Sequence, residues 1–410
     1  MPSTTENNSA EILAKFAATY KKIDLSLDRL QTFLAEIGNP QNSLPPVIHL
    51  AGTNGKGSTL AFLRAMLEAA GHSIHAYTSP HLVKFNERIM LNGKDISDEY
   101  LAELLAEIDA LTDAHPLTYF EKTTALAFLA FARNKADFLL LETGLGGTHD
   151  ATNIVDEKLL TIITPISIDH VEYLGSDLLG IAAEKAGIMR KNTPCILAQQ
   201  SPEVEKFFDS KTDYKIIKST PRHFEKLALF GEFQHINAST AVAAAKQLGI
   251  ASEHIETGLK TAKWPARMQK IESGKLFEFL PENCELWLDG GHNEAGGAAI
   301  ASSIKPDHII MGMLKSKDLN AFLQHFDPHH TTISTITISS MPEAEESTNI
   351  AKITTALGFV TNAEPNIETA FQKLQFVLET KPTKRNVLVC GSLYLAGEFL
   401  EKNYGRTKNN

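Results

Sequence analysis

The stretch Gly52–Thr59, with the sequence Gly-Thr-Asn-Gly-Lys-Gly-Ser-Thr, constrains the fold of this chain more than any other. The apolar run 46–51 before it predicts a buried strand, and the apolar spacing of 60–70 after it predicts a helix. A glycine-rich turn between a strand and a helix is the setting of a phosphate-binding loop, because inward-facing backbone N–H groups and the helix N-terminus attract anions. Lys56 can reach the terminal phosphates of a nucleotide, and a neighbouring hydroxyl can hold Mg²⁺.

This loop departs from the general P-loop pattern at two positions. Gly57 separates Lys56 from Ser58, whereas the general pattern has Ser or Thr directly after Lys. Leu50 stands where an earlier glycine is usual. The alternative interpretation is an ordinary glycine-rich turn with no ligand. The strand before the loop and the helix after it favour the phosphate-binding interpretation.

Bulk composition excludes several classes of protein. The chain has 410 residues, 43% of them hydrophobic and 21% charged, which indicates a globular protein of two or three domains. A net charge of −10 argues against a general role on nucleic acid or a membrane surface. No apolar run is long enough to span a bilayer, and the polar N-terminus predicts no signal peptide. Cys195, Cys284 and Cys390 follow no zinc spacing and lie in apolar runs, which indicates reduced thiols and a cytoplasmic protein.

The first two thirds of the chain alternate short apolar runs with amphipathic segments. Strands are expected at 73–78, 137–142, 159–164 and 195–198, and helices at 97–111, 120–134, 177–190, 233–249 and 252–263. The segment 79–89 has no clear period, which indicates an ordered functional loop. Strands that alternate with helices predict a mostly parallel sheet, so we expect a P-loop NTPase-like domain here.

A second α/β unit is expected after the interruption at Trp264-Pro265. A hairpin over 268–280, turning at Ser273-Gly274, is predicted to open it. Further strands are expected at 286–289, 308–313, 331–338 and 387–390, and helices at 294–304, 317–326, 346–357 and 366–379. The predicted fold class is therefore α/β with two domains, 1–265 and a smaller 266–410.

Candidate chemical groups cluster where the predicted strands end, which is where open α/β sheets bind ligands. Glu142 ends one strand, Asp169-His170 follow another, and Ser58 follows the P-loop lysine. Oxygen ligands and an imidazole suit Mg²⁺ near phosphates better than a zinc site. The alternatives are a capping or salt-bridging carboxylate for Glu142 and a structural histidine for His170.

Other candidates have a plainer alternative beside the functional one. Lys185 lies in an amphipathic helix, where a lysine is usually solvated. Gln234 and Asn237 could simply cap their helix. The turn Asp289-Gly290-Gly291-His292-Asn293 could bind a ribose through Asp289, or could be a tight turn without a ligand. Arg267 could reach a phosphate, or could be a surface arginine.

Taken in order, these motifs resemble the folylpolyglutamate synthase/dihydrofolate synthase branch of the Mur ligase superfamily. The resemblance spans nearly the whole chain, and the family's loop also has Gly after Lys, as at Gly57. The segments that carry it are 27–29, 38–41, 49–58, 78–82, 119–121, 141–147, 150–153, 169–170, 184–188, 289–293, 317–318 and 390–394.

The resemblance implies that ATP lies between the P-loop domain and a Rossmann-like C-terminal domain. The implied nucleotide contacts are Gly52, Thr53, Asn54, Gly55, Lys56, Gly57, Ser58, Thr59, Asn237, Arg267 and Asp289. It implies two Mg²⁺ ions, one held by Ser58, Ser79 and Glu142 and the other by His170 and Lys185. Lys185 matches a lysine that CO₂ carbamylates in this family, which would make it an anion.

The resemblance further implies an ATP-dependent ligase that joins L-glutamate to the carboxylate of dihydropteroate or a reduced folate through an acyl phosphate. The implied catalytic residues are Lys56, Lys185, His170 and His292, and the implied substrate contacts are Ser79, His81, Phe120, Glu121, Thr123 and Asp150. A monomer with no nucleic-acid or membrane partner is expected.

Two alternatives to a glutamate ligase predict different sequence features. A peptidoglycan-precursor ligase of the same superfamily normally carries a UDP-sugar domain before the P-loop, whereas about fifty residues precede it here. A non-catalytic nucleotide-binding regulator would not need Glu142, His170 and Lys185. Whether the chain makes dihydrofolate, extends the polyglutamate tail, or does both stays open.

Overall fold

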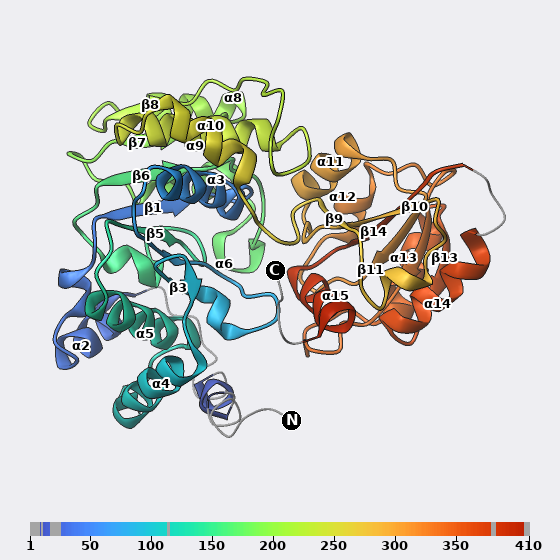
Figure 1. Ribbon diagram of the computed structural model, residues 1–410, viewed down its shortest axis with the longest axis horizontal. Coiled ribbons are helices and arrows are strands. Elements are labelled where there is room, and N and C mark those ends of the chain that lie inside the picture. The colour runs from blue at the N-terminus through green and yellow to red at the C-terminus, as the bar shows by residue number, and fades with distance from the viewer. Residues whose placement is uncertain (1–8, 10, 17–25, 113–114, 379–382, 406–410) are drawn as a thin grey trace.

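Two parallel-type sheets, each covered by helices on both faces, make up the molecule (Figure 1). The computed structural model describes residues 9, 11–16, 26–112, 115–378 and 383–405. The two-domain α/β fold class predicted from the sequence is confirmed. Within the described ranges, no helix is long and apolar enough to cross a membrane.

The first sheet has eight strands in the order β4-β3-β2-β5-β1-β6-β7-β8. Pairing is parallel from β2 to β8, and β3 and β4 add an antiparallel edge. The strands are β1 (Val47–Ala51), β2 (Ile74–Tyr77), β3 (Ile89–Leu91), β4 (Lys94–Asp95), β5 (Phe138–Glu142), β6 (Leu160–Ile163), β7 (Cys195–Leu197) and β8 (Ile216–Lys218). The strand before the P-loop, β1, is central, so the loop emerges from the middle of the sheet.

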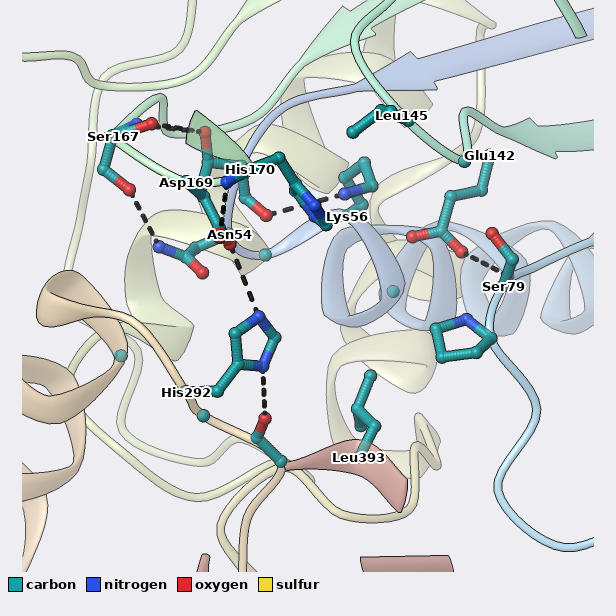
Figure 2. Close-up of a pocket in the computed structure, with 18 of the residues that line it drawn as sticks. Asn54, Lys56, Ser79, Glu142, Leu145, Ser167, Asp169, His170, His292 and Leu393 are labelled. Carbon is teal, nitrogen blue, oxygen red and sulfur yellow. Dashed lines mark hydrogen bonds and ion pairs between the residues drawn. The ribbon is translucent and has the colours of Figure 1, made fainter. Parts of the chain in front are cut away.

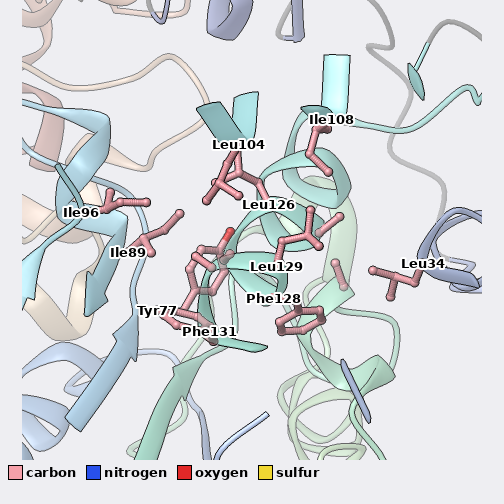
Figure 3. Packing of buried hydrophobic residues seen from close by; sticks show 14 of the residues in the cluster. Leu34, Tyr77, Ile89, Ile96, Leu104, Ile108, Leu126, Phe128, Leu129 and Phe131 are labelled. Carbon is pink, nitrogen blue, oxygen red and sulfur yellow. The ribbon is translucent and has the colours of Figure 1, made fainter. Parts of the chain in front are cut away.

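Helices cover both faces of this sheet because consecutive residues of its central strands are apolar and point to opposite faces. Leu139 and Leu141 of β5 pack with α2, α4 and α5, whereas Leu140 packs with α3, α9 and α10. Figure 3 shows the first of these cores, in which Tyr77 of β2 lies against Phe131 and Leu126 of α5. The helices are α2 (Asp28–Glu36), α3 (Lys56–Ala69), α4 (Asp98–Thr112), α5 (Tyr119–Arg133), α6 (Val171–Leu174), α7 (Leu178–Ala186), α8 (Pro202–Asp209), α9 (Gln234–Gln247) and α10 (Ser252–Thr261), with 3₁₀ turns η1 (Pro40–Ser43), η2 (Phe85–Arg88) and η3 (Ala151–Ile154).

The second sheet has six strands in the order β13-β12-β11-β14-β10-β9, all parallel except β9. Its strands are β9 (Gln269–Ile271), β10 (Cys284–Leu288), β11 (His308–Met311), β12 (Thr332–Thr335), β13 (Val360–Ala363) and β14 (Arg385–Cys390). Its helices are α11 (Glu294–Ser303), α12 (Leu319–Leu323), α13 (Ser347–Ala356), α14 (Ile367–Leu378) and α15 (Leu393–Tyr404), with the 3₁₀ turn η4 (Phe277–Phe279). The proposed boundary at 265/266 falls between α10 and β9.

The predicted hairpin over 268–280 is wrong. β9 pairs antiparallel with β10, and the residues between them include η4 instead of a return strand. The strand that pairs with β9 therefore lies beyond residue 280, and the Ser273-Gly274 turn does not determine the pairing. The short strands β3, β4, β8 and β13 were not predicted, because each has four residues or fewer and lies at or next to a sheet edge.

Lys158 gives the fold a testable dependence on pH. Its side chain is buried, and Nζ donates to Asn153 Oδ1 at 2.6 Å and to the Ile188 carbonyl at 2.9 Å. Burial, followed by repulsion from Arg190, lowers the Lys158 pKa to about 6. Above that pH the folded state holds the neutral amine while the unfolded state still binds a proton. Stability should therefore rise with pH between about 6 and the ordinary lysine pKa of about 10.4.

We expect Lys158→Met to remove this contribution. The free energy of unfolding, measured in urea at pH 6.5 and pH 9, should rise less with pH in Lys158→Met than in the wild type. Arg190 also donates to Asn153 Oδ1 and to the Ile188 carbonyl, so those acceptors keep a donor in the variant. Equal pH dependence in the two proteins would contradict the burial of a neutral lysine.

Candidate active site between the two sheets

Four adjacent strands of the first sheet deliver the candidate groups to one edge. Strands β2, β5, β1 and β6 are neighbours and parallel, so their carboxyl ends lie side by side. Ser79 follows β2, Glu142 ends β5, the P-loop follows β1, and Asp169-His170 follow β6. Residues up to 117 positions apart, from Thr53 to His170, therefore meet at one place.

The second sheet faces this edge with its own carboxyl ends. Asp289 and His292 follow β10, Lys317 follows β11, and Leu393 follows β14, and these three strands are adjacent. Together the two edges enclose a cavity of about 790 Å³. Figure 2 shows Lys56 and Glu142 on one side of this cavity, with His292 and Leu393 opposite.

The P-loop needs its glycines for close packing as well as for backbone conformation. Gly55 caps α3 with φ of 85°, and a Cβ there would lie 2.2 Å from Asn237 Oδ1. A Cβ on Gly57 would lie 2.5 Å from the Trp264 indole nitrogen. The extra glycine after Lys56 thus lets the loop approach the junction between the domains. Lys56 Nζ meanwhile lies 3.1 Å from the Gly52 carbonyl.

Glu142 is a buried carboxylate with capacity left for a cation. Its Oε2 accepts the Ser79 N–H at 3.1 Å, and its side chain points into the cavity (Figure 2). Burial raises the Glu142 pKa, while Lys56 opposes that shift by favouring the anion. Ser58 and Ser79 also line the cavity, so these side chains offer the hard oxygen donors that Mg²⁺ prefers.

Lys185 is buried, which the sequence alone did not predict. Its Nζ donates to the Gly52 carbonyl at 3.0 Å, so it touches the P-loop from α7. Burial and repulsion from Lys56 lower the Lys185 pKa to about 7. Lys185, Lys56 and His170 line a second cavity of about 20 Å³ beside the loop. An uncharged amine is therefore accessible close to the phosphate-binding loop at neutral pH.

Asp169 links the two domains. One carboxylate oxygen is paired with Lys317, and the other accepts Asn293 Nδ2 at 2.9 Å and lies 3.4 Å from His292 Nε2. The Asp169 side chain is buried and the neighbouring cations hold its pKa well below the usual range, so it is an anion. Asn293 also exchanges hydrogen bonds with Asn54 of the P-loop, at 3.2 and 3.4 Å.

His170 lies beside this network with a left-handed backbone, φ 52°. His170 stays exposed to solvent, but crowding by the surrounding groups, with the positive charges of Lys317 and Lys56 nearby, lowers its pKa to about 4. A neutral imidazole can donate a lone pair to a metal ion. Its place next to the smaller cavity suits the predicted role.

The candidate nucleotide contacts lie on both sides of the cavity. Asp289 accepts the backbone N–H groups of Met268 and Gly291, each at 2.7 Å, and its pKa is raised by burial. Arg267 and Asn237 also line the cavity. Asp289 therefore holds the turn after β10 in shape in addition to facing the cavity.

The candidate substrate residues divide into two groups. Phe120, Glu121 and Asp150 line the cavity, but both carboxylates already have partners. Glu121 accepts Thr118 N–H at 2.7 Å and pairs with Arg29 at 3.2 Å. The Asp150 carboxylate accepts the backbone N–H groups of Leu145 (2.8 Å) and Thr152 (3.0 Å) and the Thr152 hydroxyl.

Three predicted residues line neither the large cavity nor the smaller one. Thr123 is fully buried, where its hydroxyl meets Tyr77, and Thr59 is buried within α3. His81 accepts a hydrogen bond from Arg88 Nε at 2.9 Å, and burial lowers its pKa to about 4. Thr123 and His81 can therefore shape the cavity wall without facing its interior.

Three residues of the site were given no role from the sequence, although Lys317 and Asn293 lie in segments that carry the family resemblance. Arg88 is buried and lines the cavity beneath Tyr119, with its guanidinium 5.7 Å from that ring. Lys317 and Asn293 reach Asp169 across 148 and 124 positions of sequence. The available signal was position, since Arg88 lies in the unusual 79–89 segment and Lys317 follows a predicted strand.

A separate group of ligating side chains lies before and within α9. The nearest donor atoms of His223, Glu232 and His235 are within 4.8 Å of one another. His235 Nδ1, however, accepts the Phe224 N–H at 3.2 Å, so the neutral ring carries its proton on Nε2. In this arrangement one nitrogen is engaged and the other is protonated, which does not suit metal binding.

Two family models match the chain. The Mur ligase middle domain matches residues 50–220, and the C-terminal domain of dihydrofolate synthetase matches residues 273–402. The first match spans nearly all of the first sheet, from the end of β1 through β8, and the second spans most of the second sheet's domain.

Known proteins are similar over nearly the whole length. The dihydrofolate synthase/folylpolyglutamate synthase of Bacillus subtilis (strain 168) is 32% identical over 424 residues, covering 92% of this chain and 94% of that protein. The structure of E. coli FolC in complex with DHPP and ADP has a TM-score of 0.81 at 27% identity, and covers 98% of both chains. The bifunctional folylpolyglutamate synthase/dihydrofolate synthase from Yersinia pestis, complexed with AMPPNP and Mn ion, has a TM-score of 0.80 at 26% identity, covering 98% of this chain and 99% of that one.

Proposed function

Because this chain belongs to the dihydrofolate synthase/folylpolyglutamate synthase family of ATP-dependent ligases, we propose how its own residues carry out glutamate ligation. In this proposal the cavity between the sheets binds ATP, L-glutamate and the carboxylate of dihydropteroate or a reduced folate. The product is an amide, with ADP and phosphate released.

One observation carries the proposal. Lys56, Glu142, His170 and Lys185 adjoin the same P-loop edge, and a second sheet places His292 and other polar groups opposite them. A nucleotide switch needs the phosphate loop alone, whereas acyl transfer needs the reacting carboxylate, phosphate and amine held together. The enclosed volume of about 790 Å³ provides room for several reactants.

The nucleotide is proposed to span the junction. Lys56 and the loop amides of Gly52–Thr59 would hold the phosphates. Asn237 would contact adenine, Arg267 a phosphate, and Asp289 the ribose. These groups line one continuous cavity, apart from Gly52 in the smaller cavity and Thr59 within α3, which supports assigning them to a single ligand.

The donor groups also fit two divalent cations. Ser58, Ser79 and Glu142 would hold one ion, and His170 with Lys185 the other, provided that the amine of Lys185 is carbamylated. Its burial and its contact with the loop support that modification, because a neutral amine is the form that reacts with CO₂. Mg²⁺ bound there would supply charge compensation for the phosphates and the carboxylate.

Ligation then proceeds in two displacements. The acceptor carboxylate oxygen attacks the γ-phosphorus, the bond to ADP breaks, and an acyl phosphate forms. The α-amine of glutamate attacks the acyl carbon, and the tetrahedral intermediate expels phosphate with its electron pair as the amine loses a proton. Lys56 would stabilise the charge that passes to the leaving phosphate, and His292 would face the reacting groups from the second domain.

Arg88 adds a cation on the acceptor side that sequence patterns did not predict. Its guanidinium is buried against Phe85 and Tyr119 and lines the cavity near Phe120. A carboxylate of a substrate would find there a fixed partner, since guanidinium matches carboxylate geometry. The aromatic neighbours would suit a flat heterocycle.

Incorporation of L-glutamate tests the function. We expect the purified chain to consume ATP and attach labelled glutamate to dihydropteroate in the presence of Mg²⁺, and to stop when EDTA removes the metal. A parallel reaction with a reduced folate monoglutamate shows whether tail extension also occurs. Failure with every pterin acceptor, in a protein that still binds ATP, would exclude this function.

A cytoplasmic monomer is also proposed. The three cysteines are buried free thiols, which suits a reducing compartment. Size-exclusion chromatography with light scattering measures the oligomeric state directly.

A further inference from the structure

Gln234 contacts the P-loop from a distant part of the chain. It is the first residue of α9, its side chain is fully buried, and its Nε2 lies 3.3 Å from Ser58 Oγ. The two residues are 176 positions apart in sequence. Helix α9 thereby reaches the residue that the proposed function assigns to magnesium.

The orientation of the Gln234 amide is set by Asn237, one helical turn later. Asn237 Nδ2 donates to Gln234 Oε1 at 2.9 Å, so the carbonyl end of the glutamine is occupied and its NH₂ end faces Ser58. Asn237 itself lies against Gly55, close enough that a Cβ there would be 2.2 Å from Asn237 Oδ1. Asn237, Gln234 and Ser58 therefore form one chain of hydrogen bonds, in which Asn237 donates to Gln234 and Gln234 donates to Ser58.

This chain of bonds limits what the Ser58 hydroxyl can do. A hydroxyl has one proton and two lone pairs, and the Gln234 donor takes one lone pair. A serine in the first turn of a helix can otherwise turn its proton to a nearby backbone carbonyl. With Gln234 as donor, the second lone pair stays available toward the cavity, which Ser58 lines.

We propose that Gln234 is a positioning residue that couples the base-binding end of the nucleotide site to its metal-binding end. It does so by presenting Ser58 to Mg²⁺ and by fixing Asn237 where adenine would bind. The inference rests on the proposed function, which assigns Ser58 to magnesium and Asn237 to adenine. No contact between Gln234 and either ligand is required.

The test measures how strongly Mg²⁺ tightens nucleotide binding. Isothermal titration calorimetry of AMPPNP binding to the full chain gives one Kd in Mg²⁺ and one in EDTA. The Mg²⁺ ratio is the Kd in EDTA divided by the Kd in Mg²⁺. Gln234→Met keeps the size of the side chain but has no polar atom to donate. We expect the ratio to fall about fivefold, since a net hydrogen bond contributes a factor of about two to ten.

A mutant cycle separates positioning from a general loss of packing. Ser58→Ala should lower the same ratio, and adding Gln234→Met should lower it no further, because Gln234 acts through Ser58. Gln247→Met, at the exposed end of the same helix, is the matched control and should retain the wild-type ratio. If Gln234→Met does not fold, Gln234→Asn serves, since its shorter amide cannot reach both partners.

Two results would overturn the inference. One is a wild-type Mg²⁺ ratio in a folded Gln234 variant, and the other is a double variant that loses the sum of both single effects. If the wild type ligates glutamate while either result is obtained, the coupling fails and the proposed function stands. A wild type with neither ligation nor Mg²⁺-dependent binding would remove both.

Discussion

Lys185→Ala should lower the turnover of glutamate ligation by at least about 10²–10³-fold, comparable to removing a group that stabilises the transition state. Lys185 is buried 3.0 Å from the Gly52 carbonyl and adjoins the P-loop cavity with Lys56 and His170. With a pKa of about 7, roughly half of its amine is uncharged at neutral pH. We therefore expect it to react with CO₂ and to act as an anion at the metal site. The measurement is kcat in the glutamate assay.

Two further variants distinguish an anion from a buried cation. Lys185→Arg keeps a positive charge and a donor but cannot be carbamylated, so it should be as inactive as Lys185→Ala. Lys158→Met changes another buried lysine of low pKa, away from the large cavity, and should retain activity. Carbon-13 NMR of the native protein in labelled bicarbonate should show a carbamate signal that Lys185→Ala lacks. Near-normal turnover in Lys185→Arg would contradict the assigned role.

The parts of this site that could be predicted from sequence are those with a local pattern. The strand, turn and helix around Gly52–Thr59 are contiguous, and their conformation follows from glycine placement and apolar spacing. Glu142 ends one predicted strand and His170 follows another, so the topology of a parallel sheet brings them to the same edge. Those inferences need only the order of elements.

The remaining features depend on contacts between distant segments. Lys185 looks solvated in an amphipathic helix, and only packing of α7 against the P-loop buries it. Thr123 belongs to a segment that reaches the cavity, yet its own side chain points to Tyr77 because helical periodicity turns it inward. Arg88 and Lys317 belong to the site because of their contacts with Tyr119 and Asp169, respectively, and no spacing in the sequence specifies those contacts.

Asp169→Asn should loosen the arrangement of the two domains and lower turnover about a hundredfold. The Asp169 carboxylate is buried with Lys317, and removing one member of such a pair costs about 3–5 kcal/mol because the other charge is left uncompensated. Asp169 also holds His292 and Asn293 in place, so the second domain would lose its anchor beside His170. Small-angle X-ray scattering should show a larger radius of gyration, and urea unfolding a lower stability.

Adding Lys317→Met to Asp169→Asn tests whether the loss of stability arises from the uncompensated charge of Lys317. In the double variant neither ion is buried alone, so we expect stability to recover to near the wild-type value, whereas turnover stays low because His292 is still unanchored. Asp156→Asn is the matched control, since Asp156 pairs with Arg190 at 2.8 Å but is largely exposed, and such pairs contribute about 0–1 kcal/mol. An Asp169→Asn protein with unchanged scattering and unchanged turnover would show that Asp169 does not link the domains. Loss of turnover alone would instead place its role in the chemistry of the cavity.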